Sequence, residues 1–173
     1  MYKYLLFIFL SFAKTVCFSQ AVLPLKDRVR AIEEIQKDRL ENLLPQLMKR
    51  EKIDCWVIIT REYNEDPIIK SLLPPTWLNA RRRTILVFTL EEYSNKVDMA
   101  AITRYSFGSL IESVWDKEKE PDQMKALVDY LKLKNPKKIA INISDTYGIA
   151  DGLSVTDHKL LINYLPKYLK TRV

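Results

Sequence analysis

The sequence predicts an α/β fold in which helices pack on both faces of a mixed sheet. Short apolar runs rich in β-branched residues alternate along the chain with longer amphipathic stretches. Two of the runs are joined by a short polar turn, which predicts a hairpin and argues against a purely parallel sheet. The composition, with 47% hydrophobic and 29% charged residues and 3 glycines, excludes collagen-like and disordered chains, and the length of 173 residues suits one domain.

The first half of the chain predicts a long helical region at residues 22–52. Apolar residues recur there every three or four positions, from Val29 and Ile32 to Leu44 and Leu47, with charges between them. Pro45 should kink or divide this region, because it lacks a backbone donor. Residues 55–60 then form a buried strand, and residues 62–73 form a short helix or irregular loop around Pro67.

The second half predicts a hairpin, a helix, a strand and a final helix. Residues 83–90 and 97–105 are the hairpin strands, joined by a polar turn at 91–96. Residues 121–134 form a helix with Pro121 at its first position, and Asn135 and Pro136 end it. Residues 139–143 form another short strand, a loop containing Gly152 follows, and residues 154–165 form the last helix.

The N-terminal nineteen residues predict a secretory signal peptide. Residues 5–13 are apolar over the length of a signal-peptide core, well short of the roughly 18 residues that cross a membrane. Lys14 ends this run, and the small residues Cys17 and Ser19 precede a cleavage position before Gln20. We therefore expect residues 20–173 to be an exported domain, periplasmic or secreted, without a stable membrane anchor. The alternative is a lipoprotein signal acylated at Cys17, which residues 14–16 fit poorly.

Cysteine and histidine are scarce. Removal of residues 1–19 lowers the net charge from +6 to +4 and leaves Cys55 as the only cysteine, so no intrachain disulfide is expected. Cys55 lies in an apolar run, which predicts a buried small hydrophobe rather than a reactive thiol. A single His and two Cys exclude a His- or Cys-rich zinc or haem site.

The strongest basic cluster is residues 81–83, flanked by Trp77 and Arg61. Basic residues next to aromatic ones can hold nucleic acid. However, the net charge is modest and most charges alternate in sign along helices, so we expect no nucleic-acid partner. Two interpretations stay open: a salt-bridged structural cluster, and a face that binds carboxylates.

The other polar motifs have structural interpretations. Ser154 followed by Asp157 predicts a helix N-cap with an acidic first turn rather than a catalytic triad with His158, which we place at the surface or boundary. Residues 148–152 lack the spacing of a dinucleotide or phosphate loop, so they predict a plain connection. The acids at positions 54, 62, 65 and 66 lack the spacing of a metal site.

Three segments, residues 50–67, 79–88 and 141–153, carry a family resemblance, and the helical residues 28–48 with Leu44 and Pro45 agree with it. Together they resemble the N-terminal domain of the creatinase/prolidase/aminopeptidase P metallopeptidases, in particular the exported bacterial Xaa-Pro aminopeptidase-like branch. The resemblance covers essentially all of residues 20–173, in order. It implies a ribonuclease H-like α/β domain of the creatinase N-terminal type.

In complete members of this family the domain precedes a catalytic domain in which two Asp, one His and two Glu hold two divalent metals, such as manganese. The sequence ends where that domain should begin, and it contains one His. We therefore expect a truncated chain with no catalytic residue, no metal ligand and no cofactor of its own. The family's N-terminal domain contributes to subunit association and to the rim of the substrate cleft, which implies cleft or interface roles for Arg61, Tyr63, Asn64, Asp66, Trp77, Arg81 and Arg82.

The resemblance thus predicts a non-catalytic accessory domain of an exported Xaa-Pro aminopeptidase-like metallopeptidase. Its expected partners are a second copy, a peptide, or a separately encoded metallopeptidase catalytic domain, and the hydrophobic strip that normally faces that domain should be exposed. The alternative is a stand-alone periplasmic module that binds peptides or carboxylates through residues 81–83.

Overall fold

The computed structural model describes residues 22–91 and 93–173 of the chain. The predicted signal peptide, residues 1–19, lies outside these residues. Among the helices of the described residues, none is long and apolar enough to cross a membrane.

Five strands form one mixed open sheet in the order β4-β3-β2-β1-β5. β1 is antiparallel to β2, and β2 is antiparallel to β3 through the predicted polar turn. β5 runs parallel to β1, and β4 runs parallel to β3. The predicted α/β class with a mixed sheet is therefore confirmed. The strands are β1 (Cys55–Arg61), β2 (Arg83–Leu90), β3 (Val97–Ala101), β4 (Glu112–Ser113) and β5 (Ile139–Ile141).

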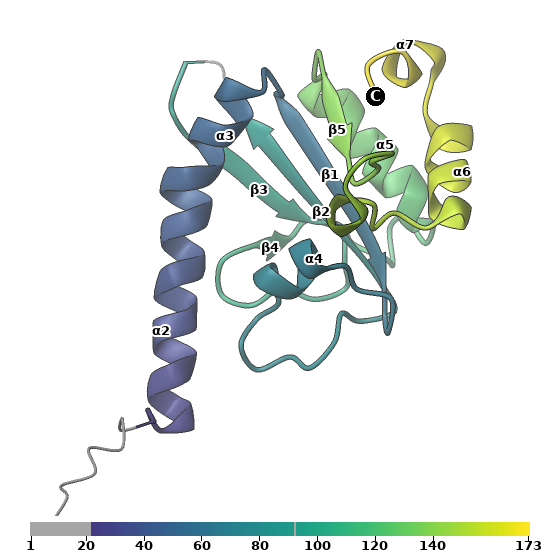
Figure 1. Ribbon diagram of the computed structural model, residues 1–173. Helices are drawn as coiled ribbons and strands as arrows, with labels where there is room; N and C mark the ends of the chain where they lie inside the picture. The colour runs from purple at the N-terminus through teal and green to yellow at the C-terminus, as the bar shows by residue number, and fades with distance from the viewer. Residues whose placement is uncertain (1–21, 92) are drawn as a thin grey trace, which may run out of the picture.

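Helices cover both faces of this sheet (Figure 1). Alternate residues of β1 point to opposite faces, so Val57 packs into one core and Ile58 into the other. The Val57 core is closed by α5 (Gln123–Lys134), α6 (Val155–Tyr164) and α7 (Lys167–Lys170). The Ile58 core is closed by residues of the N-terminal helical region and of α4 (Pro67–Leu72).

The N-terminal helical region has three consecutive parts, which are α2 (Leu25–Asp38), the π-helical turn η1 (Arg39–Leu43) and α3 (Leu44–Arg50). In the π-turn the backbone N–H of Leu44 donates to the carbonyl of Arg39, one residue further back than in an α-helix. Pro45 lies two residues after this turn, as the second residue of α3. The wider turn gives the proline ring room beside the preceding carbonyls, so the predicted division at Pro45 takes the form of a π-turn.

Several predicted boundaries were wrong, and side-chain hydrogen bonds explain two of them. Pro121 is not the first helical residue, because the Asp122 carboxylate accepts from the N–H groups of Met124 and Lys125 and caps α5 instead. β3 ends at Ala101 rather than at Tyr105, since the Thr103 hydroxyl donates to the Tyr105 carbonyl and turns the chain. β5 ends at Ile141, and both β4 and the short helix α7 were unpredicted.

Candidate functional site

The candidate site lies at the end of the sheet where β1 finishes and β2 begins. Arg61 and Arg83 are paired across these strands, and the ladder continues one step further, where the Glu62 N–H donates to the Arg82 carbonyl at 2.7 Å. The Arg82 N–H donates in return to the Glu62 carboxylate at 3.2 Å. Arg82 has a φ of 49°, a left-handed conformation that turns the chain sharply as it enters β2.

A second carboxylate, that of Glu65, joins the loop after β1 to the loop before β2. Glu65 Oε1 accepts from the N–H of Ala80 at 2.7 Å and from the N–H of Tyr63 at 3.1 Å. The Thr84 hydroxyl also donates to the Arg81 carbonyl. The backbone that carries the basic residues is thus held at several points by the protein's own polar groups, while Arg81 and Arg82 stay exposed.

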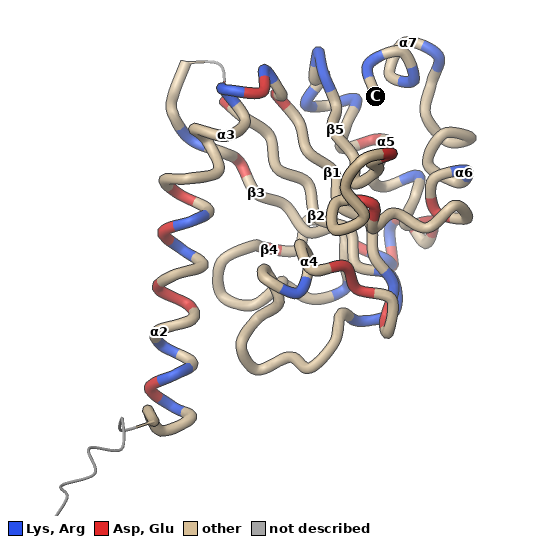
Figure 2. The backbone as a smooth tube through the Cα atoms, viewed as in Figure 1, with Lys and Arg blue, Asp and Glu red and all other residues tan. Residues whose placement is uncertain are grey.

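Between these loops and the one after β3 lies an open groove of about 500 Å³, which we call the arginine groove. Figure 2 shows basic residues at this end of β1. Of its four arginines, Arg83 is paired with a carboxylate, whereas Arg81, Arg82 and Arg104 make no ion pair within the described part of the chain. The lining residues are Glu62, Trp77, Arg81, Arg82, Arg83, Thr84, Thr103, Arg104, Tyr105, Trp115 and Gln123.

Aromatic rings form much of the groove wall. The Arg81 guanidinium lies 4.5 Å from the centre of the Trp77 ring and 6.0 Å from that of Tyr105, which are cation–π distances. Trp77 in turn packs edge-on against Phe107 at 5.3 Å, which fixes its position. A guanidinium that stacks on a ring can still donate hydrogen bonds from the N–H groups in its own plane. Two of these N–H groups can bind one carboxylate in a bidentate arrangement.

Beneath the groove, Asp157 of α6 holds the ends of the two central strands. Its carboxylate accepts two hydrogen bonds from Arg61, at 2.7 and 2.9 Å, and one from the Ser154 hydroxyl at 2.9 Å. Arg83 Nε lies 3.1 Å away as an ion pair without a hydrogen bond. Burial by itself raises the pKa of Asp157, but Arg61, Ser154 and Arg83 outweigh it and leave the pKa below its ordinary value.

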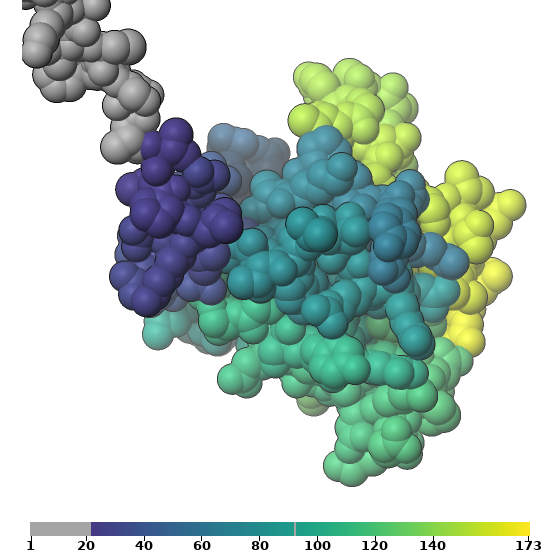
Figure 3. Space-filling view, turned by 90° about the horizontal axis from the view of Figure 1, so that it is seen from below, coloured from purple at the N-terminus to yellow at the C-terminus, as the bar shows by residue number. Residues whose placement is uncertain are grey.

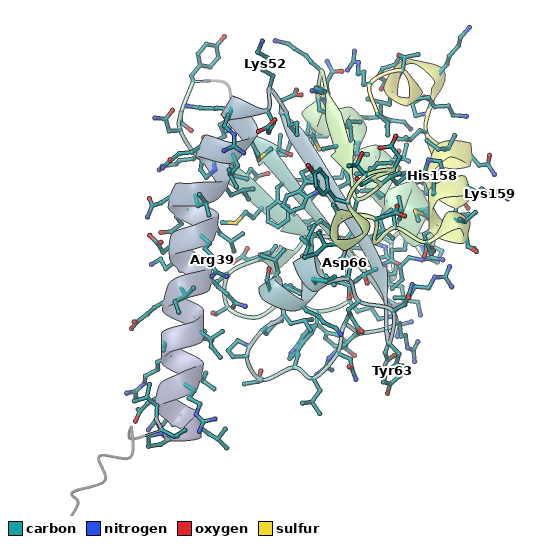
Figure 4. All side chains as sticks on the ribbon, viewed as in Figure 1. Arg39, Lys52, Tyr63, Asp66, His158 and Lys159 are labelled. Atoms are coloured by element: carbon teal, nitrogen blue, oxygen red, sulfur yellow. The ribbon has the colours of Figure 1, made fainter. Side chains whose placement is uncertain are left out.

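The seven predicted site residues divide among three places. Trp77, Arg81 and Arg82 meet in the arginine groove. The Arg61 side chain instead donates two hydrogen bonds to Asp157 and so helps to hold the ends of the strands together. Tyr63, Asn64 and Asp66 are not part of the groove; Tyr63 is exposed and points away from the body at the tip of its loop, whereas Asp66 lies farther in (Figure 4).

Asp66 belongs to a structural hydrogen-bond chain. The Trp56 indole donates to Asn142 Oδ1 at 2.8 Å, and Asn142 Nδ2 donates to Asp66 Oδ2 at 2.9 Å. The other oxygen of Asp66 caps α4 by accepting from the Ile69 N–H at 2.7 Å. Asn64 and Asp66 also line a separate hollow beside Gly152, on the loop that follows β5.

The groove contains residues that sequence reasoning missed. Arg104 and Tyr105 fall inside the predicted strand 97–105, although a basic residue next to an aromatic one at a strand end is a usable signal. Gln123 gave no signal; its amide donates to the carbonyls of Arg83 and Ile102 and joins α5 to the groove floor. The predicted Ser154 N-cap is confirmed, and His158 lies at the boundary as expected.

The described residues contain no group of three or more His, Cys, Asp or Glu side chains arranged to hold a metal ion. We therefore derive no step through a metal. Comparison of the chain with protein-family models, with curated proteins and with solved structures finds no match.

Proposed function

We propose that this chain is a non-catalytic accessory domain that binds the carboxylate of a peptide in the arginine groove. The observation that carries the proposal is a set of three arginines around an aromatic-walled hollow, Arg81, Arg82 and Arg104, whose side chains make no ion pair within the described residues. The three arginines line the same groove, and like charges repel one another. An incoming carboxylate reduces that repulsion and forms charge-assisted hydrogen bonds. Trp77 and Tyr105 offer flat apolar surface to the residue that bears the carboxylate.

We further propose that the domain is of the creatinase N-terminal type, with a ribonuclease H-like fold, and that it serves an exported Xaa-Pro aminopeptidase-like metallopeptidase. The five-stranded mixed sheet with helices on both faces supports this assignment. Two of the resembling segments, residues 50–67 and 79–88, form the strand ends and loops that border the groove. In this account the metals and the hydrolytic chemistry belong to a catalytic domain with which this one associates.

Peptide titration followed by calorimetry tests the binding proposal. A short Xaa-Pro peptide with a free C-terminal carboxylate should bind, and the same peptide with an amidated C-terminus should bind at least about tenfold more weakly, because it lacks the charge. Arg81→Ala and Arg104→Ala should each lower the affinity for the free-acid peptide by a similar factor. Arg30→Ala, which removes an exposed arginine of α2 outside the groove, is the matched control and should leave affinity unchanged.

Equal affinity for the acid and the amide would overturn the carboxylate assignment. The non-catalytic assignment has its own test, an Xaa-Pro cleavage assay of the purified chain with added manganese. No product is expected, and cleavage that follows the protein through purification would contradict the proposal. Co-purification of a metallopeptidase would distinguish an accessory domain from the alternative, a stand-alone peptide-binding module.

A further inference from the structure

α2 lies at one edge of the molecule and is held to the rest of the domain near its C-terminal end. Its C-terminal end is anchored, because Gln36 donates to the carbonyls of Ser71 at 3.2 Å and Leu73 at 2.7 Å and is buried there. Toward its N-terminus the helix extends past the sheet, and it stands at one edge of the molecule (Figures 1 and 3). Gln36 is the only residue of α2 that is fully buried.

The exposed part of α2 carries an apolar stripe. Leu25, Ile32 and Ile35 are 77%, 41% and 50% exposed, although their spacing is that of a helix packing face. Positions 25, 28, 32 and 35 follow the alternating three- and four-residue spacing at which two helices interlock. Arg28 fits such a stripe, because its aliphatic stem can cover apolar surface while its guanidinium reaches out to the Leu23 carbonyl at 2.6 Å.

The charges of α2 are divided between its two halves, with basic residues in excess in the first half and acidic residues in excess in the second (Figure 2). The helix dipole has the same direction, positive at the N-terminus and negative at the C-terminus. A parallel pair of such helices would bring like charges together, whereas an antiparallel pair brings opposite charges together. In order, the charged residues are Lys26, Asp27, Arg28 and Arg30 in the first half and Glu33, Glu34, Lys37 and Asp38 in the second.

We propose that a second copy of this chain covers the stripe, with the two α2 helices packed antiparallel about a twofold axis. In the antiparallel interlocking arrangement, Leu25 of one copy lies against Ile35 of the other, and Ile32 lies near the axis. The basic half of each helix then lies along the acidic half of its partner. This proposal is independent of the arginine groove and its ligand.

The helix is short, and this sets the expected strength of the dimer. Fourteen residues of α-helix are about 21 Å long, so the pair buries an area at or below the low end of specific protein interfaces. We therefore expect a reversible, concentration-dependent dimer that weakens as salt is added, since part of its stability comes from exposed opposite charges.

Sedimentation velocity of the protein, expressed from its full coding sequence with its N-terminus determined by mass spectrometry, tests the proposal. The wild type should shift from monomer toward dimer as its concentration rises. Ile32→Lys should weaken dimerisation by about tenfold or more, because in this arrangement position 32 lies against Arg28 of the other copy and the lysine would bring two like charges together. Leu133→Lys is the matched control, since Leu133 is an apolar, exposed residue of α5 outside the contact, and it should change the dimer constant less than twofold.

Cross-linking tests the orientation. Leu25→Cys and Ile35→Cys proteins are mixed and oxidised gently, and the products are counted by mass spectrometry. The proposal predicts that disulfides between position 25 and position 35 exceed those between like positions. A monomer at every concentration, a dimer that Ile32→Lys leaves intact, or a majority of 25-to-25 links would each overturn the proposal.

Discussion

Replacing Asp157 by Asn tests how the arginine groove is supported. Asp157 is 1% exposed and holds Arg61 through two hydrogen bonds and Arg83 through an ion pair. Breaking a buried charge pair typically costs about 3–5 kcal/mol. The side chains of Arg61 and Arg83 are 42% and 27% exposed, so water recovers part of that loss, and we expect a cost of about 2–3 kcal/mol.

The loss also has a characteristic pH dependence. The pKa of Asp157 is lowered in the folded protein, so its carboxylate contributes stability above the unfolded pKa of about 3.9. That contribution disappears as the pH falls through the lower folded pKa, where the native carboxylate takes up a proton. The stability difference between wild type and Asp157→Asn should therefore be largest near neutral pH and should close on acidification.

Urea denaturation followed by circular dichroism measures both effects, since the unfolding free energy falls linearly with denaturant. Asp145→Asn, at an exposed loop position, is the matched control and should stay within about 0.5 kcal/mol of wild type. A difference below about 0.5 kcal/mol for Asp157→Asn at pH 7, or a difference that stays constant down to low pH, would refute the reasoning.

Two further predictions concern Gly152 and Cys55. A side chain at Gly152 would overlap the Asp66 carboxylate, so Gly152→Ala should break the hydrogen bonds of Asp66 to Asn142 and Ile69. We expect it to lower the unfolding free energy by about 1–3 kcal/mol in a urea titration. Gly148→Ala is the control; its side chain meets open space and should cost less than about 1 kcal/mol, and equal costs for the two variants would contradict this prediction. Burial raises the pKa of the Cys55 thiol to about 12. A thiol reagent at pH 8 should therefore label Cys55 in unfolded protein and leave it unlabelled in native protein. Rapid labelling of the native protein would show that Cys55 is not a buried, unreactive thiol.

The sequence was informative about the sheet because apolar and β-branched residues mark buried strands directly. β2 was predicted with the bounds it has, and β1 was predicted to within one residue. The errors arose where a side chain decides the backbone path. Asp122 capping α5 and Thr103 bonding the Tyr105 carbonyl leave no periodic signal, and β4, with two residues, is too short to have a pattern.

The candidate site was predictable only where its residues are neighbours in sequence. Trp77, Arg81 and Arg82 lie on one loop and were identified together. Arg104 and Tyr105 join them through the pairing of β2 with β3. The sequence predicted that hairpin but assigned residues 104 and 105 to the strand rather than to the loop after it. Within residues 81–83, the interpretation as a salt-bridged cluster applies to Arg83 alone. Arg83 is salt-bridged to Asp157 of α6, while Arg81 and Arg82 line the open groove.

The most direct test of the central claim is to map where a peptide binds. Nitrogen–proton correlation spectra of the labelled protein, recorded during titration with a free-acid Xaa-Pro peptide, report each backbone amide and each indole N–H. The account predicts that the largest shifts occur at the Trp77 indole and at the amides of Arg81, Arg82 and Arg104, and that the amidated peptide produces far smaller ones. Shifts concentrated around Lys52 and Lys138, at the opposite end of β1, would contradict it.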